Sequence, residues 1–286
     1  MRKILFPFEE DKTLYREAYI HAVKFARKIN AELILLNVFQ VEVGNDITEE
    51  KYARLKRDNW FKAYNEISGF NKYYLEDHAN VETDLQIRFD YRFVNGILLD
   101  EIKKIAMEEE VDLMVMPISD KREFNKRQMK IMRDNVFEKN RTSLLLVPSS
   151  LQYRPLRNIV FAIDLMKLFN YQFYLNDIIN YASLFDASIH FIHISSRDNK
   201  EDWDDSKPFQ MVMDAISKNK RHSFNSLHGV NVKESINQYV EDCNAELVVL
   251  VKQQHHFPES ILHESVSKEM SMNSKVPVLI MREKRG

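Results

Sequence analysis

The sequence predicts an α/β protein made of two tandem three-layer α/β sandwich domains. Short apolar runs alternate with longer amphipathic stretches along the 286 residues. The runs are apolar at every position, which is typical of parallel strands that are buried on both faces. The same series of elements occurs twice, so we expect one domain at residues 1–150 and a second at residues 155–286.

In the first half, five runs have the pattern of strands, at residues 4–6, 33–36, 81–89, 113–116 and 144–147. Apolar residues recur at three- and four-residue intervals from Ala18 to Ile29, which places them on one face of a helix. Residues 97–106 show the same periodicity before the fourth run. Repeated helix-then-strand units of this kind predict right-handed crossovers and helices on both faces of a sheet.

The second half repeats this order. Its strand-like runs lie at residues 159–163, 189–194, 247–251 and 278–281, with a weak one at 223–227. The segment Asn30–Leu33 parallels Asp186–Ile189, and Val111–Met116 parallels residues 245–250. A segment from Pro148 to Pro155, with two serines and no periodicity, separates the halves. We therefore interpret the chain as a diverged duplication.

Composition excludes several classes of protein. The formal net charge of −2 argues against a main partner that is nucleic acid or an anionic membrane. The single cysteine, Cys243, excludes an intrachain disulfide and fits a reducing compartment. No apolar run reaches the ~18 residues of a membrane span, and the first residues lack a signal-peptide pattern, so we expect a cytoplasmic protein. Cys243 also lies on an apolar helix stripe, which predicts an inert thiol.

Glycine is rare. The chain has 5 glycines, where average usage of about 7% would give about 20. Phosphate-binding loops use glycine because it allows the backbone to approach the anion closely. This composition therefore argues against a nucleotide-dependent enzyme.

Several phrases of the sequence resemble the universal stress protein family. They are the opening strand Lys3–Glu9, the second strand Leu35–Val38, and the fourth-strand phrases 111–116 and 245–250. The closing segment, Ser265–Lys268 followed by Val276–Ile280, is also similar to that family. The resemblance implies, for each half, the fold of the adenine nucleotide alpha hydrolase-like (HUP) class, a five-stranded parallel sheet in the order 3-2-1-4-5. It further implies that the two domains pair through their fifth strands, with a homodimer as an additional expectation.

The resemblance also identifies where nucleotide would bind. Members that bind ATP carry a glycine-rich loop after the fourth strand, whose amides face the phosphates. The positions of the first two loop glycines are Pro117 and Asp120 in the first half, and Val251 and Gln254 in the second. The matched cofactor-binding positions that remain are Glu9, Asp164 and Ser265. We therefore expect no cofactor and no ATP binding.

Two further clusters are candidate ligand sites. A side-chain anion site could replace the lost loop in the first half, although a solvated helix face explains the same cations, Lys121, Arg122, Lys126, Arg127 and Lys130. In the second half, His255, Glu259 and His263 are spaced four apart and are weak candidates for a metal site. Pro258 lies inside that set and opposes the helical geometry that the spacing needs, so we expect no metal.

The aromatic segment from Thr48 to Leu75 leaves two alternatives open. It packs on its own sheet, or it offers a docking surface to a partner. No catalytic motif is present, since there is neither a Gly-x-Ser-x-Gly elbow nor a Gly-x4-Gly-Lys-Ser/Thr loop.

We therefore expect a non-enzymatic stress-response module for interaction or sensing, with a protein or small-molecule partner. One alternative is an ATP-binding universal stress protein with weak ATP hydrolysis. Another is an α/β enzyme or binder for small anionic ligands that uses the basic loop 121–133.

Overall fold

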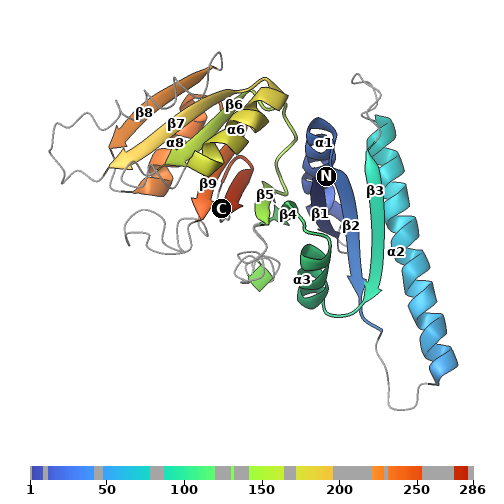
Figure 1. The fold of residues 1–286 in the computed structure, drawn as a ribbon. Helices are drawn as coiled ribbons and strands as arrows, with labels where there is room; N and C mark the ends of the chain where they lie inside the picture. The colour runs from blue at the N-terminus through green and yellow to red at the C-terminus, as the bar shows by residue number, and fades with distance from the viewer. Residues whose placement is uncertain are drawn as a thin grey trace.

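A computed structural model describes residues 2–8, 12–41, 48–77, 87–119, 130–131, 142–163, 172–195, 221–228, 231–252 and 274–282. Their strands form one ten-stranded sheet in the order β3-β2-β1-β4-β5-β10-β9-β6-β7-β8. Within each half the strands are parallel and follow the order 3-2-1-4-5. The predicted fold class is therefore confirmed, with the two five-stranded sheets joined into one (Figure 1).

The first half runs from β1 to β5. Its elements are β1 (Lys3–Phe8), α1 (Lys12–Ile29), β2 (Glu32–Phe39), α2 (Glu49–Asp77), β3 (Arg88–Asn95), α3 (Leu98–Glu108), β4 (Leu113–Ile118) and β5 (Ser143–Pro148). Buried residues of α1 and α2 pack on one face of the sheet, and those of α3 pack on the other. The periodicity predicted for α1 is confirmed, because Ala18, Ala22, Phe25 and Ala26 are almost fully buried.

The second half runs from β6 to β10. Its described elements are β6 (Asn158–Ile163), α6 (Gln172–Phe185), β7 (Ser188–Ser195), β8 (His222–His228), α8 (Val232–Asp242), β9 (Leu247–Lys252) and β10 (Val278–Arg282). Helix α6 packs on the same face as α1, and α8 packs on the same face as α3. The described residues contain no helix that is both long and apolar enough to cross a bilayer.

The third strand of the first half differs from the prediction. We expected it at residues 81–89, but β3 spans Arg88–Asn95, and residues 81–86 lie outside the described part. In β3 the aromatic residues Phe89, Tyr91 and Phe93 alternate with Arg88, Asp90 and Arg92. The strand has no continuous apolar run, because β3 lies at the edge of the sheet and one of its two faces is polar.

The two halves meet along β5 and β10. These fifth strands pair antiparallel, with Leu144, Leu145 and Leu146 opposite Ile280, Leu279 and Val278. The prediction that the halves pair through their fifth strands is confirmed. On one face of this seam α1 also contacts α6, where the rings of Phe25 and Phe185 lie 5.0 Å apart.

The connection between the halves packs against α1. The ring of Tyr153 meets the ring of His21 edge-on at 5.0 Å, and its backbone N–H donates to a carboxylate oxygen of Glu17, at 3.1 Å. His21 is buried, and its Nδ1 lies 2.8 Å from the backbone oxygen of Glu17. Burial lowers the pKa of His21 to about 4, so its ring is neutral at physiological pH.

Four helices end without glycine. The residue in the left-handed region is Asn30 after α1, Glu110 after α3, Asp186 after α6 and Asn244 after α8, each with φ between 50° and 54°. Glycine is the usual residue at this position because it carries no Cβ. The scarcity of glycine therefore extends to the helix caps, where polar residues adopt the strained conformation in both halves.

Candidate functional site

Ligands of open α/β sheets bind beyond the carboxyl ends of the strands, where the strand order reverses. In the first half this point lies between β1 and β4. The carbonyl of Phe8, the last residue of β1, accepts a hydrogen bond from the buried amide of Asn37 on β2, at 3.0 Å. In the second half His193 on β7 takes the same place, with its Nδ1 3.3 Å from the carbonyl oxygen of Ile163, the last residue of β6. In both halves, a side chain of the second strand thus lies within hydrogen-bond distance of the last backbone carbonyl of the first strand.

The positions of the first loop glycines lie within strands. Pro117 is buried in β4 and is paired in register with Val147 of β5. Val251 is 2% exposed in β9. Proline has no N–H to donate, and both side chains fill space that glycine would leave open. Neither position therefore provides the close backbone approach that a phosphate cradle requires.

The outer strands end in a polar cluster around Asn95, the last residue of β3. Its side-chain oxygen accepts from the N–H of Val41 at 3.0 Å, and its amide donates to the hydroxyl of Tyr52 on α2 at 2.8 Å. The N–H of Gly96 donates to the carbonyl of Phe39 at the end of β2. These bonds hold Val41, just after β2, and Tyr52 near the start of α2 against the end of β3.

Most of the site residues expected from the sequence lie outside the described part of the chain. These are Glu9, Asp164, Ser265, Lys121, Arg122, Lys126, Arg127, His255, Glu259 and His263. Lys130 is described, and its side chain is exposed in a helical segment beside the buried Ile131. Among the residues that are described, no group of three or more His, Cys, Asp or Glu side chains could hold a metal.

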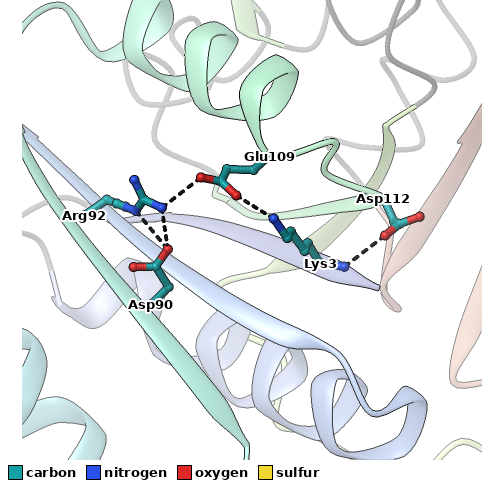
Figure 2. A network of polar contacts seen from close by, with 5 residues as sticks. All are labelled: Lys3, Asp90, Arg92, Glu109 and Asp112. Atoms are coloured by element: carbon teal, nitrogen blue, oxygen red, sulfur yellow. Dashed lines mark hydrogen bonds and ion pairs between the residues drawn. The ribbon is translucent and has the colours of Figure 1, made fainter. Parts of the chain in front are cut away.

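Four side chains that the sequence analysis did not single out form a charged network on the α3 face of the sheet (Figure 2). Glu109, directly after α3, lies between Lys3 of β1 and Arg92 of β3. Its carboxylate accepts from Lys3 Nζ at 2.5 Å and from Arg92 at 2.8 Å. Arg92 also donates to Asp90 at 2.8 Å. The network thus ties the first strand, the edge strand and the end of α3 together.

Hydrogen bonds within the network set its protonation. The hydrogen bond from Lys3 lowers the pKa of Glu109, and the same bond raises the pKa of Lys3. The backbone N–H of Lys3 also donates to the carboxylate of Asp112, the residue before β4, at 2.9 Å. The sequence signal that could have revealed the network is the alternation of charged and aromatic residues along β3, because it predicts a strand with one polar face.

A neutral network takes the corresponding place in the second half. Its members are Asn158, His190, Ser223, Asn225 and Tyr239. His190 lies 3.2 Å from Asn158 Oδ1 through Nε2 and 2.9 Å from Ser223 Oγ through Nδ1. The Asn225 amide donates to the Tyr239 hydroxyl at 2.6 Å. Burial lowers the pKa of His190, which favours its neutral form.

Cys243 differs in part from its prediction. It follows the last residue of α8 and is half-buried at the helix end, where its Sγ lies 3.9 Å from the carbonyl oxygen of Val240. Burial raises the pKa of the Cys243 thiol. Since the thiolate is the reactive form, this site fits the expected inert thiol although its side chain is not fully enclosed.

The aromatic segment forms most of α2, which packs on its own sheet through part of its surface; a docking role for the rest stays a prediction. Ala63 and Ile67 are buried against the sheet, as expected for core packing. Trp60, Phe61 and Tyr64 remain 38%, 52% and 39% exposed. Figure 1 shows α2 running along the outer side of β3, at one end of the sheet. The helix therefore covers its sheet with one face and presents aromatic rings on another.

Comparisons with solved structures show the fold. A universal stress protein from Archaeoglobus fulgidus DSM 4304 superposes with a TM-score of 0.67 at 12% identity, over 98% of this chain and 96% of that one. A functionally unknown protein from Pseudomonas aeruginosa PAO1 gives a TM-score of 0.64 at 13% identity, over 99% and 93% of the two chains. The cytoplasmic domain of a prokaryotic cation chloride cotransporter gives 0.56 at 11% identity, over 98% and 94%.

Sequence comparison assigns the second half of the chain to a family. No curated protein sequence matches the chain significantly. The model of the universal stress protein family matches residues 156–282, which extend from the end of the connecting segment to the last residue of β10. The second half of the chain thus belongs to the universal stress protein family, and the first half has the same strand order and the same fold.

Proposed function

We propose that the protein is a non-enzymatic universal stress protein-like module for interaction or sensing that no longer binds ATP. The observation that carries the proposal is the pair Pro117 and Val251. By the family resemblance both stand where the phosphate loop begins, and both are buried strand residues with side chains in place of glycine. A triphosphate needs a row of backbone amides at this point, and a proline or an enclosed valine does not supply one.

The ends of the first strands support the same proposal. The carbonyl of Phe8 has its partner in Asn37, and the carbonyl of Ile163 lies within reach of His193. These ends are therefore satisfied by side chains of the protein itself. The rarity of glycine across the chain agrees with this, with 5 in 286 residues.

Release of bound nucleotide tests the proposal. The freshly purified full chain is denatured and removed, and the supernatant is analysed for adenine nucleotides by absorbance and mass spectrometry. We expect no nucleotide and no change in the melting temperature when ATP and magnesium are added, because a ligand that binds only the folded state raises that temperature. ATP near one equivalent per site would overturn the proposal, and an Asp164→Asn variant that releases it would identify the second half as the binding site.

A further inference from the structure

We propose that an exposed face of α2, formed by Arg54, Arg57, Trp60, Phe61 and Tyr64, is the docking surface for an acidic segment of a partner protein. We call these five residues the α2 patch. The inference rests on the proposed function, since it assigns a surface and a class of partner to that interaction module.

The position of α2 explains why its aromatic rings are exposed. Ala63 and Ile67 make the buried contact with the sheet. Phe61 lies two positions from Ala63 in the sequence, which is about 160° around the helix, and is 52% exposed.

The rings of the α2 patch are held in place by one another and by β3. Trp60 and Tyr64 stack at 5.4 Å with an interplanar angle of 4°. Phe93 of β3 meets Trp60 edge-on at 5.4 Å and Tyr64 at 6.1 Å, and Phe61 meets Trp60 at 5.3 Å. Side chains that are ordered before binding lose little conformational entropy when a partner arrives. Tryptophan, tyrosine and arginine are also the residues that contribute most to protein interfaces.

Charge indicates which partner fits. The α2 patch itself carries two cations, Arg54 and Arg57, while the acidic residues Glu50 and Asp58 lie one helical turn from Arg54. Arg57 is exposed, and Arg54 lies 3.9 Å from Asp58 with both side chains largely in solvent, so that ion pair is weak. A positive patch on a chain whose net charge is −2 attracts a negatively charged segment and sets its orientation. The exposed rings then require apolar side chains beside those charges.

The same observations favour a protein segment over a membrane or a nucleic acid. A helix that lies in a membrane interface inserts its whole apolar face, but Ala63 and Ile67 on α2 are buried against the sheet. Single-stranded nucleic acid stacks its bases on free aromatic faces, whereas Trp60 already stacks on Tyr64. The α2 patch is thus suited to the mixed acidic and apolar surface of a peptide.

Fluorescence anisotropy with labelled peptides tests the inference. The probes are synthetic twelve-residue peptides in which four to six glutamates flank two leucine or phenylalanine residues, and the matched peptides carry glutamine in place of glutamate. We expect the acidic set to bind the full chain and the glutamine set to bind about tenfold or more weakly. Arg57→Glu and Phe61→Ser should each weaken binding of the acidic set by about tenfold or more.

Lys104→Glu is the matched control. Lys104 is exposed on α3, which packs on the opposite face of the sheet, and the change reverses the same charge as Arg57→Glu. Binding by Lys104→Glu should equal that of the original chain. Far-ultraviolet circular dichroism and the melting temperature check each variant's fold, which Phe61→Ser should retain because Phe61 is the most exposed ring of the patch.

Three results would overturn the inference: no acidic peptide binds, the control loses binding as strongly as Arg57→Glu, or phosphatidylserine vesicles or single-stranded DNA bind through these residues more tightly than the peptides. The same protein preparation is assayed for released ATP. Bound ATP together with peptide binding would overturn the proposed function alone. Absence of ATP together with absence of peptide binding would overturn this inference alone.

Discussion

The two halves of the chain have polar networks at the same position of the same fold, one charged and the other neutral. Lys3 and Asn158 each begin the first strand of their half. Each is paired in register with the first residue of the second strand, which is Glu32 for Lys3 and Ser188 for Asn158. Asp90 and Arg92 on β3 correspond to Ser223 and Asn225 on β8, because they face the third and fifth residues of the second strand. The first half fills this place with ion pairs, and the second fills it with neutral hydrogen-bonding groups.

Exposure explains how both solutions are stable. The side chains of Lys3, Asp90 and Glu109 are 22% to 28% exposed, and that of Arg92 is 41% exposed, so water reaches the charges. In the second half a half-buried histidine lies at the centre, where its neutral form avoids the cost of desolvating a charge. Both halves therefore place polar groups at this position of the fold, but only the first half makes them charged. The two halves should therefore respond differently to salt, and buried histidines should make the whole chain sensitive to acid.

Acid should have the largest effect. His21, beside Tyr153 at the seam, has a pKa of about 4 in the folded protein and about 6.5 in the unfolded chain, so the unfolded chain binds the proton more tightly between these values. The contribution of neutral His21 to the free energy of unfolding is fully present above pH 6.5. It should fall by about 3 kcal/mol as the pH drops to 4. The Tyr153 ring meets that of His21, and the side chains of Glu17 and Lys24 contact Tyr153 in turn.

Urea unfolding between pH 7 and pH 4, with nuclear magnetic resonance titration of His21, measures this effect. His21→Gln should show a much shallower loss of stability over that range. A titration midpoint of His21 near 6.5 in the folded protein would contradict the prediction. His190 should add a smaller loss of the same sign, because burial lowers its pKa as well. Glu109 acts only at lower pH, since its pKa is held below the ordinary carboxylate value and its stabilisation is lost as the pH falls through that lowered pKa.

Removal of one hydroxyl tests the neutral network. Tyr239→Phe deprives the Asn225 amide of its acceptor at 2.6 Å and should lower the free energy of unfolding by about 1–2 kcal/mol. The loss should be equal in low salt and in 1 M sodium chloride, because no ion pair is involved. Urea unfolding at both salt concentrations measures it, and a loss that vanishes in high salt would show that charge dominates in this half too.

Glu109→Gln tests the charged network. The change removes the carboxylate that pairs with both Lys3 and Arg92, and we expect a loss of about 1 kcal/mol in low salt. Salt screens part-exposed charges, so the loss should shrink in 1 M sodium chloride. The same unfolding experiment gives the answer. If the loss is as large in high salt as in low salt, the contrast between the two halves fails.

The helix caps offer the smallest and most direct comparison between the halves. Glu110 and Asn244 have the same φ of 50° at the ends of α3 and α8. Glu110→Gly should stabilise the protein by about 0.5–1 kcal/mol, because glutamate is strained in the left-handed region and glycine is not. Asn244→Gly should gain less, since asparagine tolerates that region. Thermal unfolding of both variants measures the order, and an equal or larger gain at Asn244 would contradict it.

The sequence predicts the buried part of the fold well and the polar part poorly. The strands around Leu35, Val115 and Val249 are apolar throughout, and α1 has a clear helical period, so both can be recognised locally. The expected position of β3 begins about seven residues too early, because the strand alternates polar and aromatic residues and has no continuous apolar run. Glu109, Lys3 and Arg92 come from three separate elements, and the alternation along β3 indicates a polar face but not which residues meet on it. Such contacts depend on strand order and register, which only the assembled sheet provides.

The pairing of β5 with β10 has a consequence for synthesis of the chain. The ribosome completes β5 at Pro148, but β10 begins only at Val278, about 130 residues later. At 5–20 residues per second this interval is on the order of ten seconds. During that time the outer edge of β5, with three consecutive leucines, has no strand to pair with. A nascent first half therefore exposes an unpaired apolar strand edge that the last strand later covers, and such an edge favours association between unfinished chains.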